Sequence, residues 1–132
     1  MKIEHIAMYV RDIENVKYFF QTFFMAQANA GYQNPQTGLK TYFLTFDDHT
    51  RLEIMTRPEM DDMEKTVFRT GYIHIAFALE NADAVEQLTE KLDAAGYTIL
   101  SAPRVTGDGY YESCILGPEN NVIELVAASK ED

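Results

Sequence analysis

The chain opens with a stretch in which apolar and polar residues alternate, followed by a stretch with helical spacing. Residues 2–10 alternate and end at Arg11-Asp12, which predicts a β-strand. Asp12 is a suitable helix N-cap, and the apolar residues after it recur at helical spacing. The pattern therefore predicts a helix over residues 13–25 that buries Val16, Phe19, Phe20 and Phe23.

The remaining patterns predict further strands and a second helix. In the first half, a loop at 31–38 and a turn at 47–50 separate strand patterns at 39–46 and 51–56. In the second half, Asn81 is a suitable cap for a helix that Gly96 ends. The elements expected there are a strand at 72–79, a helix at 82–95, strands at 97–100, 110–116 and 122–127, and a last turn at 117–121.

The second half of the chain repeats the first. His5-Ile6-Ala7 returns as His74-Ile75-Ala76, and the strand beginning at Arg51 returns as the strand beginning at Val122. The repeat predicts one α+β domain over residues 1–132, built from two βαβββ modules at 1–56 and 72–132. Residues 57–71 are expected to be a solvated linker, and the alternative is a mobile flap over a site.

Composition narrows the function classes. The 132 residues carry 21 acids and 11 bases, a formal charge of −10, which disfavours binding to nucleic acid or to an anionic membrane surface. No apolar run is long enough for a membrane span, and Glu4 stands where a signal peptide needs its apolar stretch. The single cysteine, Cys114, cannot form an internal disulfide, so we expect a cytoplasmic protein.

Strand alternation places four polar residues on equivalent faces. Along each strand the apolar residues occupy one side, which is expected to pack against the helix. The opposite side, which must become a concave site or an interface, carries His5, Glu53, His74 and Glu124.

These four residues have the chemistry of a metal site. Glu124 lies between Val122 and Val126, where an ionised carboxylate needs a cation or a hydrogen-bonding partner. Two imidazoles and two carboxylates, one of each per half, can surround a divalent ion such as Zn, Ni, Co, Fe or Mn. The alternative is two His–Glu surface pairs on sheets that never meet. His49, in a turn beside two acids, is expected to be solvated.

A four-residue hairpin loop predicts which side chains line the same surface. Such a loop at 47–50 places Leu44 opposite Glu53 and Tyr42 opposite Met55. The same logic places Ile115 opposite Glu124, with Tyr111 and Ser113 lining the site. Cys114 then falls on the helix side, as a buried and inert thiol.

These residues resemble the vicinal oxygen chelate superfamily, and within it the glyoxalase I branch (lactoylglutathione lyase-like proteins). The resemblance covers nearly the whole chain and is carried by residues 3–12, 51–54, 71–76 and 117–125. It implies the glyoxalase/bleomycin resistance/dihydroxybiphenyl dioxygenase fold, in which two βαβββ modules form a concave mixed sheet. It also implies that His5, Glu53, His74 and Glu124 bind one divalent metal ion per site.

The resemblance implies a mechanism and an assembly. The metal would hold two vicinal oxygens of a small substrate and stabilise an enediolate, while Glu53 or Glu124 moves a proton between adjacent carbons. In glyoxalase I the substrate is a thiol hemithioacetal, and the reaction makes the enzyme a carbon–sulfur lyase. Family architecture also implies a homodimer, in which each site joins modules of two chains.

The substrate end departs from glyoxalase I. That branch places an arginine four residues after the first histidine, where this chain has Tyr9, and an asparagine four residues after the first glutamate, where it has Arg57. An aromatic ring cannot replace a guanidinium in bidentate carboxylate binding, so a thiol other than glutathione, or a substrate without a thiol, fits as well. Tyr9 and Arg57 are nevertheless expected to contact the substrate.

Three other functions within the superfamily stay open. A fosfomycin-resistance enzyme opens an epoxide and uses two histidines and one glutamate as ligands, so Glu53 would be a fourth ligand-type residue. Ring-cleaving dioxygenases use two histidines and one carboxylate for ferrous iron and are usually longer. A drug-binding dimer of the bleomycin-resistance kind lacks the full ligand set that is intact here.

Overall fold

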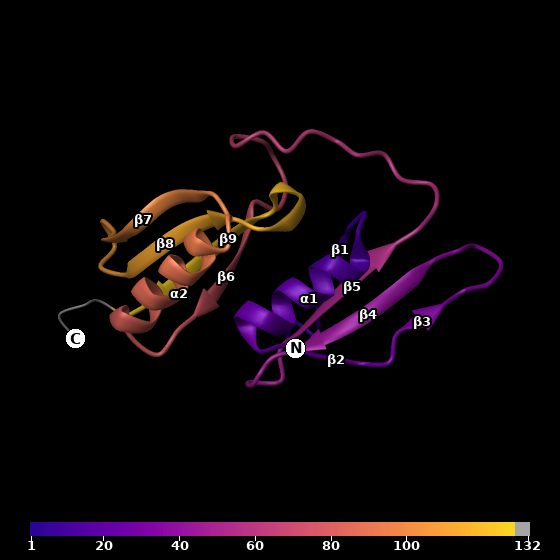
Figure 1. Cartoon of the computed structure of the whole chain (residues 1–132), viewed down its shortest axis with the longest axis horizontal. Coiled ribbons are helices and arrows are strands. Elements are labelled where there is room, and N and C mark those ends of the chain that lie inside the picture. Colours follow the sequence, from indigo (N-terminus) through magenta and orange to yellow (C-terminus); the bar gives the residue numbers. More distant parts are fainter. Residues whose placement is uncertain (129–132) are drawn as a thin grey trace. The chain divides into compact units, whose positions relative to one another are not determined.

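The computed structural model describes residues 1–128, which form two compact units, Met1–Met63 and one that begins at Glu64 (Figure 1). The first unit contains β1 (Ile6–Tyr9), α1 (Ile13–Phe24), β2 (Gln27–Ala28), β3 (Tyr32–Gln33), β4 (Lys40–Thr45) and β5 (Arg51–Thr56). The second contains β6 (His74–Ala78), α2 (Ala82–Ala94), β7 (Ile99–Val105), β8 (Tyr111–Leu116), the 3₁₀ turn η1 (Pro118–Asn120) and β9 (Val122–Ala127). The predicted α+β repeat is confirmed.

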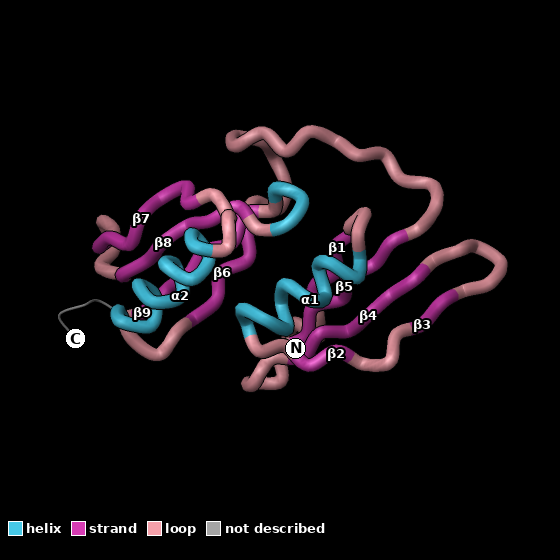
Figure 2. The backbone as a smooth tube through the Cα atoms, in the orientation of Figure 1, coloured by secondary structure: helices cyan, strands magenta, loops and turns pink. Residues whose placement is uncertain are grey.

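The two units share one topology. The first sheet has the order β1-β5-β4-β2, with β3 also paired to β4, and the second has the order β6-β9-β8-β7. In each, the opening strand runs parallel to the closing strand, and the remaining pairs are antiparallel. Residues 57–73, between β5 and β6, contain neither helix nor strand (Figure 2).

Each helix begins at the predicted cap and packs on one face of its sheet. The Asp12 carboxylate accepts a hydrogen bond from the Asn15 amide (3.1 Å), and the Asn81 side chain accepts one from the Ala84 amide (2.9 Å). The buried residues of α1 include the predicted Val16, Phe19 and Phe20, whereas Phe23 is only partly buried. α2 buries Val85 and Leu92 against its own sheet.

β2 and β3 are missing from the sequence prediction, which assigns no element to residues 26–30 and treats residues 31–38 as loop. Each is two residues long, too short for an alternation to be recognised. Asn29 lies between β2 and β3 and continues their pairing with β4. Its amide N–H donates to the Phe43 carbonyl (3.1 Å), and its side-chain oxygen accepts from the Phe43 amide (3.0 Å).

The hairpin between β4 and β5 is one residue shorter than predicted, which changes the register. Phe46 N–H donates to the Thr50 carbonyl (3.0 Å), and three residues, 47–49, form the tip. His49 closes this turn in the left-handed conformation (φ 69°), the arrangement of a type I turn followed by a bulge. Phe43, not Leu44, therefore lies opposite Glu53.

The same correction applies to the hairpin between β8 and β9. Gly117 N–H donates to the Asn121 carbonyl (2.8 Å), and Asn120 is left-handed (φ 61°) at the position equivalent to His49. Cys114, not Ile115, therefore lies opposite Glu124. Because neighbouring residues of a strand point to opposite faces, a shift of one residue moves every side chain of β4 and β8 to the other face.

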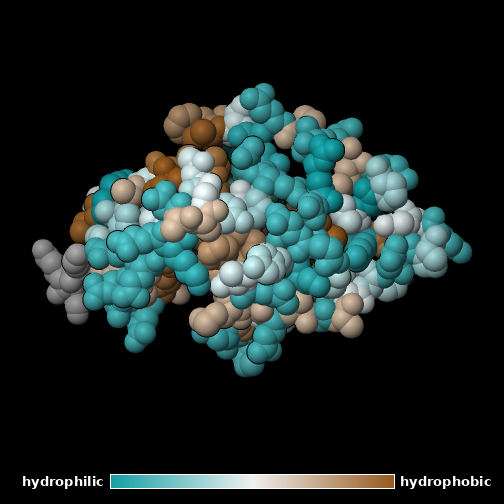
Figure 3. Space-filling model, in the orientation of Figure 1, coloured by the Kyte–Doolittle hydropathy of each residue, from teal (hydrophilic) through white to brown (hydrophobic). Residues whose placement is uncertain are grey.

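Surface properties agree with the charge of the chain. The face drawn in Figure 3 is predominantly hydrophilic, as expected for a chain with 32 charged residues, the sum of 21 acidic and 11 basic side chains. Among residues 1–128, no helix has the length and hydropathy that crossing a membrane requires.

Glu14 gives the first unit a pH-dependent link between α1 and β4. Its carboxylate accepts hydrogen bonds from Lys40 Nζ (2.8 Å) and Tyr42 Oη (2.6 Å) and pairs with Lys17 Nζ (3.2 Å). Hydrogen bonds from Lys40, Tyr42 and Lys17 lower the pKa of Glu14 to about 2. Since the folded pKa lies below the ordinary value, this contribution to stability is present above pH 4.5 and is lost as the pH falls through 2.

We therefore expect Glu14→Gln to lower the free energy of unfolding at pH 7, by roughly 1 kcal/mol once solvent screening of this exposed group is taken into account. The difference from the wild type should shrink as the pH is lowered from 5 to 2. Urea unfolding across this range measures it, with the exposed Glu64→Gln as the control. A difference that does not change with pH would contradict the assignment.

Candidate metal centre

The first unit brings His5 and Glu53 together on the sheet face that α1 does not cover. β1 and β5 pair with Ala7 beside Glu53, so His5, two residues earlier on the chain, lies on the same side as Glu53. His5 Nε2 lies 3.7 Å from Glu53 Oε1, with the side chains 36% and 18% exposed. The Phe43 ring meets the His5 imidazole edge-on, with 5.3 Å between the ring centroids.

The second unit repeats this pair. β6 and β9 pair with Ala76 beside Glu124, and His74 lies two residues from Ala76 on the same face. His74 Nε2 lies 3.7 Å from Glu124 Oε2, and the exposures, 35% and 21%, match those of the first pair. The duplicated sequence thus produces the same donor geometry twice.

The geometry of each pair fits one half of a metal centre. A separation of 3.7 Å is longer than a hydrogen bond, yet one ion about 2.1 Å from each atom could contact both. Among residues 1–128, no group of three or more His, Cys, Asp and Glu side chains has the geometry of a metal site. Each pair therefore needs ligands from elsewhere to complete a coordination sphere.

The surroundings of the two pairs differ. In the first unit, Glu4 Oε1 lies 2.8 Å from His5 Nδ1 and 2.8 Å from Arg51 Nη2. The hydrogen bonds with His5 and Arg51 hold the pKa of Glu4 below its ordinary value. The Arg51 guanidinium stacks over the Phe43 ring, 4.0 Å from its centroid. None of these neighbours of His5 was identified from the sequence.

In the second unit, the neighbours are a carboxyl group and a thiol. Burial, followed by a hydrogen bond and charge repulsion from Glu124, raises the pKa of Glu112 to about 7. Cys114 is half-buried opposite Glu124, and burial raises the pKa of its thiol. The correct register would have identified both residues, because positions 112 and 114 share the face of Glu124.

Three predicted substrate-binding residues lie on the helix side instead, as a direct consequence of the register. Tyr42 Oη donates to Glu14 of α1 (2.6 Å), and Ser113 Oγ is hydrogen-bonded to Thr89 Oγ1 of α2 (2.8 Å). Tyr111 Oη donates to Glu86 of α2 (2.5 Å). All three side chains are buried at the helix–sheet interface rather than on the surface of the His–Glu pairs.

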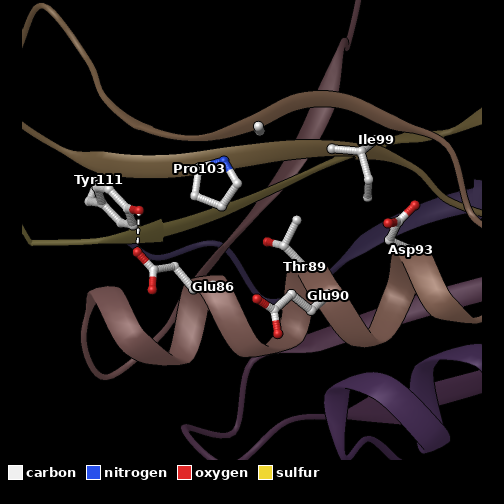
Figure 4. Close-up of a pocket in the computed structure, with 8 residues that line it drawn as sticks. Glu86, Thr89, Glu90, Asp93, Ile99, Pro103 and Tyr111 are labelled. Atoms are coloured by element: carbon white, nitrogen blue, oxygen red, sulfur yellow. Dashed lines mark hydrogen bonds between the residues drawn. The ribbon is translucent and has the colours of Figure 1, made fainter.

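Tyr111 lies at one end of a pocket between α2 and β7, on the opposite face of the sheet from Glu124 (Figure 4). The pocket has a volume of about 520 Å³. Carboxylates of α2 line one wall and apolar residues of β7 the other; the lining residues include Glu86, Glu90, Asp93, Ile99 and Pro103.

Tyr9 and Arg57, the other predicted substrate contacts, lie beside each other. Tyr9 pairs with Met55, on the same face as Glu53, and is 52% exposed. Hydrogen bonds to Tyr9 and then to Glu59 raise the pKa of Arg57. The structure thus places a cation next to an exposed aromatic ring on the face that carries the first His–Glu pair.

Known proteins are similar to this chain in sequence or in structure. The uncharacterized protein YqjT of Bacillus subtilis (strain 168) is 31% identical over 130 residues, which span 96% of this chain and 99% of that protein. A glyoxalase family protein from Bacillus cereus superposes with a TM-score of 0.82 at 16% identity, covering 98% of this chain and 95% of that one.

Two further solved structures are similar in fold to this chain. A glyoxalase I variant from Zea mays gives a TM-score of 0.80 at 20% identity, with 97% of this chain covering 45% of that one. The fosfomycin resistance protein FosX from Listeria monocytogenes, complexed with Mn(II) and sulfate, gives 0.73 at 22% identity and covers 98% and 94%. Residues 2–125 match the sequence model of the Glyoxalase/Bleomycin resistance protein/Dioxygenase superfamily, and the chain belongs to this superfamily.

Proposed function

We propose that the chain is a metal-dependent lyase or isomerase of glyoxalase I type. Its one divalent ion per site would be held by His5, Glu53, His74 and Glu124. The observation that carries this proposal is the duplicated geometry, a histidine Nε2 at 3.7 Å from a glutamate oxygen in each unit. Imidazole nitrogen and carboxylate oxygen together suit Ni, Zn, Co, Mn or Fe.

The assembly that we propose is a homodimer in which each metal is shared between chains. One pair supplies two ligands, fewer than the three or four protein ligands of a typical catalytic ion, so two pairs are needed. We propose that His5 and Glu53 of one chain meet the second pair of another. The single cysteine of the chain favours a cytoplasmic location, where disulfides are rare.

The proposed reaction acts on a small substrate with oxygens on adjacent carbons. A divalent ion, when bound, supplies Lewis-acid polarisation of those oxygens. The carboxylate of Glu53 or Glu124 would remove a proton from one carbon and return it to the next. A hemithioacetal of methylglyoxal with a low-molecular-weight thiol has the required arrangement of atoms.

Tyr9 and Arg57 are the proposed contacts with the rest of the substrate. Arg57 offers a cation to an anionic substrate group, and Tyr9 offers an exposed ring and a hydroxyl. This pair differs from the arginine and asparagine typical of glutathione-dependent members, so we propose that the substrate carries another thiol in place of glutathione or has no thiol.

A fosfomycin-resistance activity is the second candidate. It is supported by the similarity to the Listeria protein, which was solved with Mn(II). Glu53 distinguishes the candidates, because an enzyme that needs two histidines and one glutamate would keep its metal in Glu53→Gln. A drug-binding protein without catalysis would bind no metal at all.

Metal analysis of the purified wild-type chain tests the proposal, and we expect about one divalent ion per chain. Isomerase assays would then compare glutathione with other thiol hemithioacetals in the presence of Ni, Co, Zn and Mn. The chain has three histidines, so His49→Asn, in an exposed turn, is the matched control for His5→Ala and His74→Ala. A wild-type chain that binds none of these ions would refute the proposal.

A further inference from the structure

The two ring nitrogens of His5 face two different carboxylates. Nδ1 lies 2.8 Å from Glu4 Oε1, within hydrogen-bond distance, while Nε2 lies 3.7 Å from Glu53 Oε1. A carboxylate oxygen can only accept, so the proton of a neutral His5 belongs on Nδ1. The lone pair then lies on Nε2, the nitrogen that faces Glu53.

Glu4 is itself held in place by a second contact. Arg51 Nη2 donates to the same oxygen, Glu4 Oε1, at 2.8 Å. The guanidinium stacks on the Phe43 ring, which also forms a T-shaped contact with the His5 imidazole. Arg51 therefore fixes the carboxylate while Phe43 supports both the guanidinium and the imidazole.

The second unit provides an internal comparison. Ile73 stands where the repeat has Glu4, and an isoleucine cannot accept a hydrogen bond from the next residue. Among residues 1–128, the polar side chain that contacts the His74 ring is Glu124, on Nε2. Both units thus have the same candidate ligands. Among residues 1–128, a carboxylate at the Nδ1 side of the imidazole is present in the first unit and not in the second.

We propose that Glu4, held by Arg51, is a positioning residue that fixes the tautomer and orientation of His5 so that Nε2 is presented as a ligand. A carboxylate behind a metal-binding imidazole orients the ring and raises its basicity. The part that concerns metal affinity rests on the proposed function. The part that concerns the tautomer holds for the metal-free protein.

Long-range ¹H–¹⁵N spectra of the metal-free protein test the tautomer directly. The spectra are recorded at a pH above 8, which exceeds the ordinary pKa of an imidazole, and three histidines give three assignable rings. We expect His5 to carry its proton on Nδ1 in the wild type, and Glu4→Ala to convert it to the tautomer mixture of the solvated His49. His74 should not change, and the exposed Glu64→Ala should leave all three rings unchanged. A wild-type His5 with the same mixture as His49 would overturn the proposal.

Metal titration of the same variants tests the consequence for binding. Glu4→Ala should weaken Zn or Co binding about 10- to 100-fold, the usual effect of removing such a supporting group, and Arg51→Met should weaken it less. Unchanged affinity in Glu4→Ala would overturn the positioning role while leaving the proposed metal centre intact. A wild type that binds no metal would refute the metal centre, and the tautomer spectra would still decide whether Glu4 positions His5.

Discussion

Replacing Glu124 by Gln should remove both the metal and the activity. The amide has nearly the same shape as the carboxylate but carries no charge, so the variant loses an anionic ligand without leaving a cavity. A bound ion contributes several kcal/mol of transition-state stabilisation, and we expect turnover to fall by about 10³-fold or more. Metal content after gel filtration and the rate of hemithioacetal isomerisation measure the two effects.

Two controls make this result specific. Glu112→Gln removes a carboxyl group from the same face of the sheet. If this variant keeps its metal, the loss of metal in Glu124→Gln is due to a missing ligand and not to a missing negative charge nearby. Glu64→Gln, exposed in the segment between β5 and β6, controls for the loss of one acid from the chain. Full metal occupancy in Glu124→Gln would refute its role as a ligand.

Mixing two inactive variants should restore activity if each site joins two chains. In a dimer of a His5→Ala chain with a Glu124→Gln chain, one site carries both substitutions and the other carries none. Random association gives mixed dimers in half of the cases, so we expect about a quarter of the wild-type activity after unfolding and refolding the two variants together.

The control for this experiment lies within one unit. His5→Ala and Glu53→Gln both alter the first pair, so their mixed dimers contain no intact site under the shared arrangement. If the His5→Ala and Glu124→Gln mixture stays inactive, then each site lies within one chain, or the chain is not a dimer. Light scattering distinguishes these two outcomes.

The sequence was sufficient to predict the fold because its signals are local. Along β5 and β9, Glu53 and Glu124 point to one face of the sheet, and their neighbours Ile54 and Leu125 point to the other face and are buried. This alternation is a property of each strand alone and does not depend on any partner strand. The caps Asp12 and Asn81 are equally local, since each bonds to an amide three residues ahead. The repeat then transfers each conclusion from one half to the other.

The candidate site was harder to predict because it depends on pairing between strands. The hairpin tips determine which side chains face Glu53 and Glu124. At each tip a left-handed residue, His49 or Asn120, closes a three-residue loop where four residues were predicted. Asparagine tolerates that conformation well, so Asn120 was a usable signal, whereas His49 was a weak one. The contacts of Glu4 with His5 and Arg51 require side-chain positions that no local pattern encodes.

The same hairpin tips limit how this chain can vary over evolutionary time. A glycine in place of His49 or Asn120 would suit the backbone there and leave the strands in phase. A single-residue insertion or deletion must instead be absorbed within the loop, because sliding one strand past its partner by one residue would move the Glu53 carboxylate into the core and Ile54 out of it. Indels should therefore be tolerated freely between β5 and β6, and at the two tips only where the loop itself takes up the change.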